Sequence, residues 1–244
     1  MPFLHFDMEQ IILVESKELM ILEQRFIRNI PSLSEKEQAG LAGKRAAVIG
    51  CGGLGGYIVE ILARVGLGGI TVADGDVFDE SNLNRQCLAL PENLGQNKAR
   101  AAEARIKAID EKIDVRCFEE FFSGKNADAI LKDADIVLDA LDSVPVRLLL
   151  EDKCGEKGLH LVHGAVELWQ AQVCMVSPGS GTLHRLYGEA KTGPAGSVTA
   201  PAAAMCAAMQ CSQALQFLCG KACGLENKLF LADLQTMDFE KISL

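Results

Sequence analysis

Cysteine pairs at metal-ligand spacing are missing from this sequence. It has nine cysteines, but no two of them stand in a C-x-x-C arrangement. Structural zinc sites commonly need such pairs, so we expect no zinc. Because the number is odd and most of these cysteines lie in apolar surroundings, the count is typical of free thiols in a reducing, cytoplasmic compartment.

The sequence also lacks a recognisable targeting segment and membrane span. Its first ten residues, MPFLHFDMEQ, contain two acidic residues and no lysine or arginine, unlike a signal peptide. The longest weakly polar stretch, residues 198–219, is rich in alanine and is interrupted by Pro201 and several glutamines. This stretch predicts a buried core helix and no association with a membrane.

An excess of basic residues is missing as well. The chain has 24 Lys and Arg against 33 Asp and Glu, which gives a net charge of −9. General binders of nucleic acids or anionic membranes present a basic face, so the charge argues against both classes. Aromatic residues make up only 5% of the chain, and we expect the single tryptophan, Trp169, to pack rather than to recognise a ligand.

Apolar segments of strand length alternate with segments of helix length along most of the chain. Short apolar runs at 46–50, 69–74 and 134–141 are each followed by a helical pattern. Such alternation is typical of a doubly wound, Rossmann-like α/β fold with a mostly parallel sheet. Two later segments, at 228–234 and 238–244, predict an antiparallel pair that completes the sheet.

The N-terminal residues form a separate feature. Apolar residues recur at helical spacing between residues 19 and 30 and predict a helical arm that ends at a proline. Ser34 and Glu37 then fit a capping box for a short helix. We therefore expect an N-terminal helical arm, residues 1–31, followed by a single α/β domain, residues 32–244.

A glycine-rich turn follows the first predicted strand. Gly50, Gly52 and Gly55 have the spacing G-x-G-x-x-G, which allows a tight turn into a helix whose amide end faces a phosphate. Asp74 ends the next strand, where a carboxylate commonly accepts hydrogen bonds from ribose hydroxyls. These features alone fit a nicotinamide-dependent oxidoreductase as well as an enzyme that uses ATP.

Charged residues near this turn favour ATP. Asp76, Asn82 and Arg85 follow closely behind the second strand, and Lys98 begins the next predicted helix. A dinucleotide does not need these cations, whereas the pyrophosphate that leaves a reacting triphosphate gains charge that fixed cations stabilise. Asp142, at the end of another strand, suits Mg²⁺, which takes one or two carboxylates beside phosphate oxygens.

Taken together, the motifs resemble the MoeB/ThiF/HesA family, the bacterial relatives of the ubiquitin-activating enzymes. The glycine turn, the Asp74-x-Asp76 pair, SNLNRQ, GQNK and LDALDS occur in the family's order, from about Arg25 to the C-terminus. The resemblance implies an adenylyltransferase that uses ATP and Mg²⁺. Its substrate would be the C-terminal Gly-Gly carboxylate of a small, ubiquitin-like β-grasp sulfur carrier. The reaction would serve molybdopterin or tungstopterin, thiamine or related sulfur-transfer biosynthesis.

The resemblance also implies which residues form the nucleotide loop. Gly50, Gly52, Gly53 and Gly55 would shape this loop, and Asp74 would hold the ribose.

The same resemblance assigns the charged residues. Asp76 would belong to the nucleotide site, and Asn82 and Arg85 would contact the triphosphate. Lys98 would contact it as well, and Asp142 would bind Mg²⁺. Arg85, Lys98 and Asp142 would thus be catalytic.

An arginine on the N-terminal helix of this family reaches into the neighbouring subunit's nucleotide site. Arg28, in the segment RFIRNI, takes the matching position. The resemblance therefore implies a homodimer with two shared sites, in which Arg28 is a catalytic residue. The periodicity alone fits a solvated arginine on an amphipathic arm.

Other interpretations stay open. The chain departs from the family where many members bind zinc, and residues 177–199, a predicted long loop, contain no cysteine for a thioester. We expect Asp139 to have a structural role and His163 to be an ordinary sheet residue. The alternatives to adenylation are an NAD-dependent oxidoreductase and a carrier-binding scaffold without catalysis. The motifs do not identify the carrier.

Overall fold

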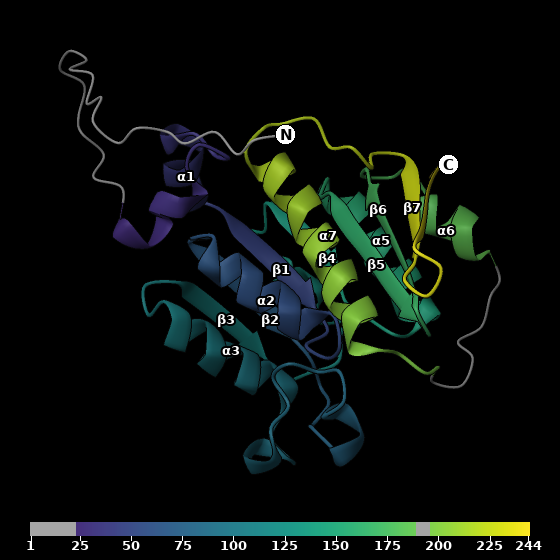
Figure 1. Ribbon diagram of the computed structural model, residues 1–244, viewed down its shortest axis with the longest axis horizontal. Coiled ribbons are helices and arrows are strands. Elements are labelled where there is room, and N and C mark those ends of the chain that lie inside the picture. The colour runs from purple at the N-terminus through teal and green to yellow at the C-terminus, as the bar shows by residue number, and fades with distance from the viewer. Residues whose placement is uncertain (1–22, 189–195) are drawn as a thin grey trace.

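The computed structural model describes residues 23–188 and 196–244, which form a single eight-stranded sheet with helices on both faces (Figure 1). The strand order is β3-β2-β1-β4-β5-β6-β7-β8. The first five strands in this order are parallel, and β5 to β8 pair antiparallel. This arrangement confirms the expected Rossmann-like, mostly parallel sheet with an antiparallel C-terminal part.

The parallel strands are short, and the three central ones are buried along their whole length. Their bounds are β1 Arg45–Ile49, β2 Gly69–Ala73, β3 Asp114–Phe118, β4 Ile136–Asp139 and β5 Leu161–Glu167.

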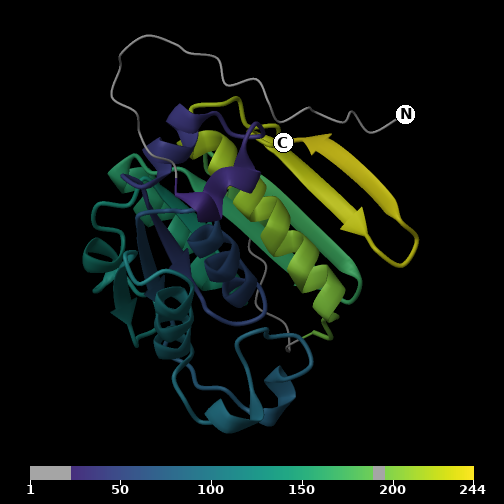
Figure 2. The same ribbon diagram turned by 60° about the vertical axis from the view of Figure 1, so that its left-hand side comes forward.

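The antiparallel strands are β6 Gln170–Val176, β7 Lys228–Asp233 and β8 Asp238–Ser243. Figure 2 shows β7 and β8 as a hairpin at the far edge of the sheet. The predicted final pair is confirmed.

The helices divide between the two faces of the sheet. One face carries α2 Gly55–Arg64, α3 Lys98–Ile109 and α7 Ala200–Leu218. The other carries α4 Ala127–Ile130, α5 Val144–Lys157 and α6 Thr182–Tyr187. Within the described residues, no helix has both the length and the apolarity to cross a membrane.

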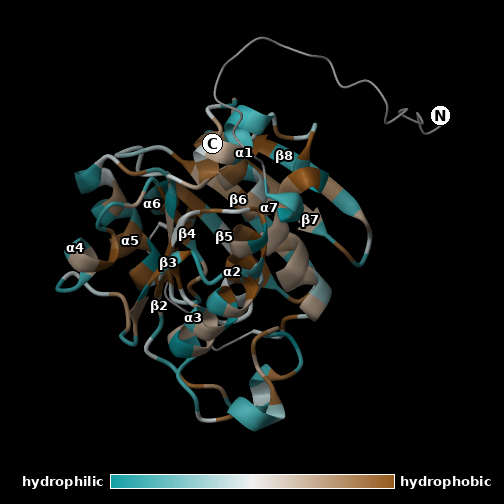
Figure 3. Ribbon diagram, turned by 90° about the vertical axis from the view of Figure 1, so that its left-hand side faces the viewer, coloured by the Kyte–Doolittle hydropathy of each residue, from teal (hydrophilic) through white to brown (hydrophobic). Residues whose placement is uncertain are grey.

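Strand β1 shows why the sheet needs cover on both sides. Ala46 and Val48 belong to the apolar core under α2 and α7, and Ala47 and Ile49 belong to the core on the opposite face. Successive side chains in a strand point to opposite faces, so a continuous apolar run must be buried twice. Figure 3 shows this concentration of apolar residues in the central strands.

The structure describes only the end of the predicted N-terminal helical arm. Residues 1–22 of the predicted arm lie outside the described residues. The remainder forms a short 3-10 helix, η1 Gln24–Asn29, which ends before Pro31 as predicted. The next helix, α1 Glu35–Leu41, begins at the predicted capping box, in which the Ser34 side chain accepts from the Glu37 amide.

The prediction of a structureless loop over residues 177–199 is wrong for α6. Glu151, buried on α5, accepts hydrogen bonds from the amides of Leu183 at 2.9 Å and His184 at 3.1 Å. These amides lie in the first turn of α6, where helical N–H groups lack partners of their own. A carboxylate more than thirty positions away therefore stabilises a helix whose own sequence gives little sign of it.

Candidate active site at the carboxyl edge of the sheet

The carboxyl ends of β1, β2 and β4 meet at one edge of the sheet. Ile49 is level with Ala73 on one side and with Asp139 on the other. The end of β1 is tied to both neighbours, since the Gly50 amide donates to the Ala73 carbonyl and the Ala140 amide donates to the Ile49 carbonyl, each at 2.9 Å. In open α/β sheets this edge is where ligands bind. The segments after these three strands contain most of the predicted site residues.

The four predicted glycines serve two different purposes. At Gly50, where φ is +96°, a Cβ atom would lie 2.5 Å from the Ala140 carbonyl oxygen. At Gly55, a Cβ atom would overlap the Gly50 carbonyl oxygen. These two glycines let the backbone of the turn close on itself and on β4.

Gly52 and Gly53 instead leave space above the turn. A Cβ atom at Gly53 would meet no atom within 4 Å, and one at Gly52 would lie 3.5 Å from Gln86 Nε2. The helix that follows, α2, has no side-chain cap from the described residues. The start of α2 therefore carries the partial positive charge of the helix dipole without a side-chain cap, next to the open space at Gly53, an arrangement suited to a phosphate.

Asp74 joins the glycine turn to the end of β2. Its carboxylate accepts from the Cys51 amide at 2.7 Å and from the Asp76 amide at 2.8 Å. Burial raises the pKa of Asp74, although both amide bonds oppose that shift. Each oxygen keeps acceptor capacity beyond its one amide bond, so a ribose hydroxyl could donate to it.

Lys98 lies beside this carboxylate at the start of α3. Lys98 is only 6% exposed, and its ammonium pairs with Asp76 at 2.5 Å. Burial disfavours the charge on Asp76, but Lys98 and the Val77 amide together hold its pKa below the ordinary value. Asn97 caps α3 and also donates to the Asp74 carbonyl at 3.0 Å. The lysine is thus fixed against the glycine turn by the segment after β2.

Asn82 and Arg85 follow on the excursion between β2 and α3, the loop that projects below the sheet in Figure 1. Asn82 is buried and accepts from the Asp79 amide at 3.3 Å. Arg85 is half-buried and donates to the Ser81 carbonyl at 2.9 Å and to Asn84 at 2.8 Å. In residues 23–188 and 196–244 this guanidinium has no ion pair, so its charge is available to an anion.

Gln86 is a residue of this site to which the sequence analysis gave no role. It is 5% exposed, and its side-chain oxygen is buried without a hydrogen-bond partner among the described residues. Because the same amide group faces Gly52, this unpaired atom lies next to the open part of the turn. Its place in SNLNRQ, directly after Arg85, was the available signal.

Asp142 lies in the turn between β4 and α5 and is exposed. In the part of the chain that the structure describes, no group of three or more His, Cys, Asp or Glu residues could hold a metal. One exposed carboxylate fits Mg²⁺, which retains water and takes phosphate oxygens as its remaining ligands.

Arg28 is the one predicted site residue that the fold keeps away from this edge. It is exposed on η1, and its neighbour Phe26 packs against Gly66, beyond the C-terminal end of α2. The glycine turn lies at the opposite end of α2, a ten-residue helix that spans about 15 Å. Arg28 therefore does not join the site of its own chain.

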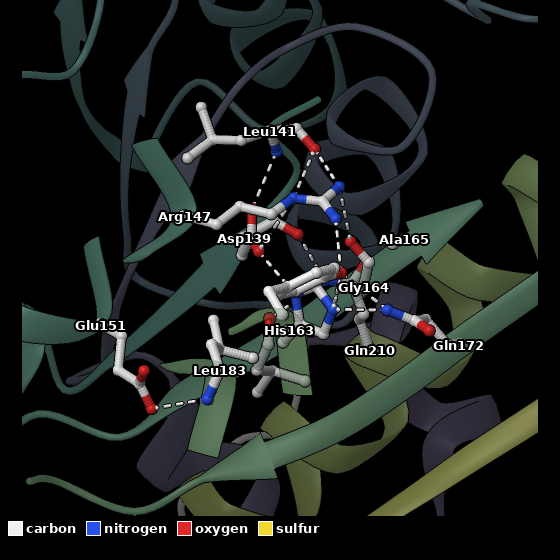
Figure 4. Close-up of polar contacts among 12 residues, drawn as sticks. Asp139, Leu141, Arg147, Glu151, His163, Gly164, Ala165, Gln172, Leu183 and Gln210 are labelled. Carbon is white, nitrogen blue, oxygen red and sulfur yellow. Dashed lines mark hydrogen bonds and ion pairs between the residues drawn. The ribbon is translucent and has the colours of Figure 1, made fainter. Parts of the chain in front are cut away.

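A cluster of buried polar residues lies next to the Asp142 turn. Apart from Asp139 and His163, its members were not singled out as polar site residues from the sequence. We call this cluster the Asp139 network; its members are Asp139, Arg147, His163, Gln172 and Tyr187. Figure 4 labels the first four of them. Asp139 and His163 are fully buried and lie 2.6 Å apart through Oδ2 and Nδ1. His163 is a sheet residue, as expected, but it is also the centre of this cluster.

Charge in the Asp139 network is balanced. Burial lowers the pKa of His163, although Asp139 opposes the shift, so the imidazole is neutral at neutral pH. Burial also disfavours the charge of Arg147, but Asp139, 3.6 Å away, raises the pKa of this guanidinium overall. The buried guanidinium is therefore paired with a carboxylate, which offsets part of its desolvation cost.

The cysteines of α7 are packing residues. Cys206 and Cys211 are buried, and burial raises the pKa of the Cys206 thiol to about 12. A thiol with so high a pKa is a poor nucleophile at neutral pH. The buried core helix predicted over residues 198–219 is confirmed.

The fold and this edge define an α/β nucleotide-binding protein with cations placed beside a glycine turn. A profile of the ThiF family matches residues 24–244, and the chain belongs to that family. It is 30% identical to the SAMP-activating enzyme E1 of Haloferax volcanii, over 89% of this chain and 84% of that protein. It is also 30% identical to the molybdopterin-synthase adenylyltransferase of Escherichia coli, over 85% and 86%.

A third relative, the sulfur carrier protein ThiS adenylyltransferase of Bacillus subtilis, is 34% identical over 76% of this chain and 57% of its own length. Among solved structures, E. coli MccB with ATP superimposes with a TM-score of 0.78 at 18% identity, covering 92% of this chain and 72% of MccB. At this low identity the likeness concerns the fold alone. The resemblance stated from the motifs is confirmed.

Proposed function

We propose that this protein is an ATP-dependent adenylyltransferase that activates the C-terminal carboxylate of a small sulfur-carrier protein. Relatives named for this activity match it over most of their length and most of this chain. The observation that carries the proposal is the charge pattern at the glycine turn. Lys98 and Arg85 stand beside an uncapped helix start, an arrangement that suits a triphosphate better than a dinucleotide.

The open part of the turn supports this placement of ATP. The phosphates would lie above Gly52 and Gly53, where a side chain would otherwise intrude, and would face the first amides of α2. The ribose would donate to Asp74, whose oxygens retain acceptor capacity. Gln86 would gain the partner that its buried oxygen lacks.

Asp142 is the residue that would hold Mg²⁺. Bound there, the metal would neutralise charge on the triphosphate oxygens. The cationic residues of this chain would then position the triphosphate. Lys98 is held by Asp76, and Arg85 by the carbonyl of Ser81, so both cations are oriented before the reaction.

The reaction itself needs little further chemistry from the protein. The carrier's carboxylate attacks the α-phosphorus, the bond from that phosphorus to the bridging oxygen breaks, and pyrophosphate leaves with the bonding electrons. A carboxylate is ionised at neutral pH, so no general base has to remove a proton. Lys98 and Arg85 stabilise the charge that develops on the departing pyrophosphate. The product is an acyl-adenylate.

Arg28 supports a homodimer as the working unit. Since Arg28 lies beyond the far end of α2 from its own glycine turn, a second copy of the chain would have to receive it. Each site would then combine Lys98 and Asp142 of one subunit with Arg28 of the other. We further infer a Gly-Gly tail on a β-grasp carrier, a chain without structural zinc, and a cytoplasmic location that suits its free cysteines.

The test is Mg²⁺-dependent exchange between ATP and labelled pyrophosphate, with and without a Gly-Gly-tailed carrier from the same organism. The proposal requires exchange that depends on the carrier and falls at least a hundredfold in Arg85→Ala and Asp142→Ala, as is typical when a transition-state contact is removed. Tight binding of NADH without binding of ATP would favour an oxidoreductase instead. Binding of both ATP and carrier without exchange would favour a scaffold.

A further inference from the structure

The turn that presents Asp142 is held from inside the protein. The Leu141 amide donates to Asp139 Oδ1 at 2.9 Å, and the Leu141 carbonyl accepts from Arg147 Nε at 3.1 Å and from Arg147 Nη2. Both polar groups of this residue are therefore fixed by buried side chains. Figure 4 shows these bonds around Leu141. Asp142 is the next residue, so its backbone position follows from them.

Arg147 can make these bonds because its remaining surroundings are polar and buried. Arg147 is 7% exposed, and its guanidinium lies 3.6 Å from Asp139 and donates to the Tyr187 hydroxyl at 2.8 Å. A buried guanidinium that loses a partner carries a large desolvation cost. The network therefore favours one arrangement of the turn.

The hydrogen bonds around His163 assign a single proton arrangement. His163 Nδ1 donates to Asp139, which leaves Nε2 as the acceptor. The Tyr187 hydroxyl donates to Nε2 at 3.0 Å and accepts from Arg147 and from Gln172 Nε2, the latter at 2.7 Å. The hydroxyl thus uses its one proton and both acceptor positions. Its removal would leave Arg147 Nη1 short of a partner, whereas His163 Nε2 and Gln172 Nε2 would keep their own contact at 3.1 Å.

Tyr187 is also the link to α6. It is the last residue of that helix, whose first turn is held by Glu151 on α5. Asp142 lies directly before α5 on the other side of the same network. The Tyr187 hydroxyl therefore connects α6 to the Asp142 turn, because it accepts from Arg147, which in turn donates to the Leu141 carbonyl.

We propose that Tyr187, His163 and Arg147 are positioning residues that fix the Asp142 turn for the metal-bound triphosphate. The effect on adenylation rests on the proposed function, whereas the effect on the turn itself does not. Tyr187→Phe is the sharpest probe, because it removes the hydroxyl and keeps the ring that packs edge-on against His163.

Tyr57→Phe is the matched control. Tyr57, on α2, is the other tyrosine of the chain and packs on the face of the sheet opposite to Tyr187. Arg147→Lys is a second probe, since lysine keeps the charge but cannot make the forked contact with the Leu141 carbonyl. Circular dichroism would establish that each variant is folded.

The first measurement is amide hydrogen exchange of the protein alone, without nucleotide, metal or carrier. We expect Tyr187→Phe to speed exchange at Leu141 about fivefold, as the loss of one hydrogen bond implies, with no change in β1 or α3. Tyr57→Phe leaves Leu141 unchanged. Equal exchange at Leu141 in wild type and in both Tyr187→Phe and Arg147→Lys overturns the proposal.

The second measurement is pyrophosphate exchange across a range of Mg²⁺ concentrations. Tyr187→Phe should lower kcat about fivefold and raise the Mg²⁺ concentration needed for half-maximal rate, while KM for ATP stays within twofold because Asp74 and the glycine turn are intact. Faster amide exchange together with no activity in the wild type would retain the positioning role and reject the proposed function. An unchanged Mg²⁺ requirement would overturn the link to Asp142.

Discussion

Replacing Gly50 by alanine tests whether the glycine turn and the Asp142 turn are built against each other. The new Cβ atom would lie 2.5 Å from the Ala140 carbonyl oxygen and 2.9 Å from the Ala140 carbonyl carbon, closer than the 3.0 Å that real Cβ contacts respect. The positive φ of Gly50 adds about 1–2 kcal/mol of backbone strain. Relief of the overlap by a shift of the neighbouring peptide adds about 1–3 kcal/mol. We therefore expect a total loss of about 2–5 kcal/mol in the free energy of unfolding.

Gly158→Ala is the control for this variant. Gly158 also has a positive φ, +67°, but a Cβ atom there would meet nothing within 4 Å. The free energy of unfolding of Gly158→Ala should decrease only by the backbone strain, about 1–2 kcal/mol. Because Ala140 leads directly to the Asp142 turn, Gly50→Ala should also lower pyrophosphate exchange by about a hundredfold, the effect of a displacement near 1 Å.

Urea unfolding and pyrophosphate exchange would be measured on both variants. The reasoning is refuted if Gly50→Ala is no less stable than Gly158→Ala, or if it retains wild-type exchange.

Three further predictions follow from the site. Inactive dimers of Arg28→Ala and of Asp142→Ala would be mixed and their subunits allowed to exchange. Half of the resulting dimers are hybrids with one intact site, so the mixture should regain about a quarter of wild-type activity in a pyrophosphate exchange assay. No recovery of activity would contradict a shared site. Lys98→Ala should lower the exchange rate by about 10²–10³-fold, and a loss below tenfold would reject its catalytic role. Burial holds the pKa of His163 in the folded protein below 6.5, its value in the unfolded chain. As the pH falls below 6.5, the unfolded chain therefore takes up a proton that the folded protein does not. The free energy of unfolding then decreases by up to about 1.4 kcal/mol per pH unit. Urea unfolding at pH 7.5 and 5.5 should show this loss in the wild type but a smaller one in His163→Gln, and equal losses would contradict a buried neutral imidazole.

Local sequence signals located most of the fold. Strand β1 was predictable because a short, continuous apolar run between a charged pair and a glycine turn is typical of a buried strand. The capping box at Ser34 and Glu37 was predictable because both partners lie within one helical turn. In each case the residues that determine the structure are close together in the chain.

Features that depend on distant residues were not predictable. Helix α6 begins where Glu151 supplies its cap, and Glu151 lies on another helix. The Asp139 network needs the parallel register that sets Asp139 level with His163, and no local pattern contains that register.

The glycine turn lies between these cases. Its spacing identified Gly50 and Gly55 together with Gly52 and Gly53, but only the structure separates their purposes. The first pair avoids the protein's own backbone, whereas the second pair leaves space for a ligand. Arg28 is similar, since its motif was visible but its distance from its own site was not.

Formation of an acyl-adenylate on the carrier is the central claim, and intact-mass spectrometry of the carrier tests it most directly. The protein would be incubated with ATP, Mg²⁺ and the Gly-Gly-tailed carrier, and the carrier would be analysed without added sulfur donor. The account predicts a carrier that is heavier by one adenylyl group, and no such species with Asp142→Ala or with a carrier that lacks its last glycine. A carrier of unchanged mass, under conditions in which the protein binds both ATP and carrier, would contradict it.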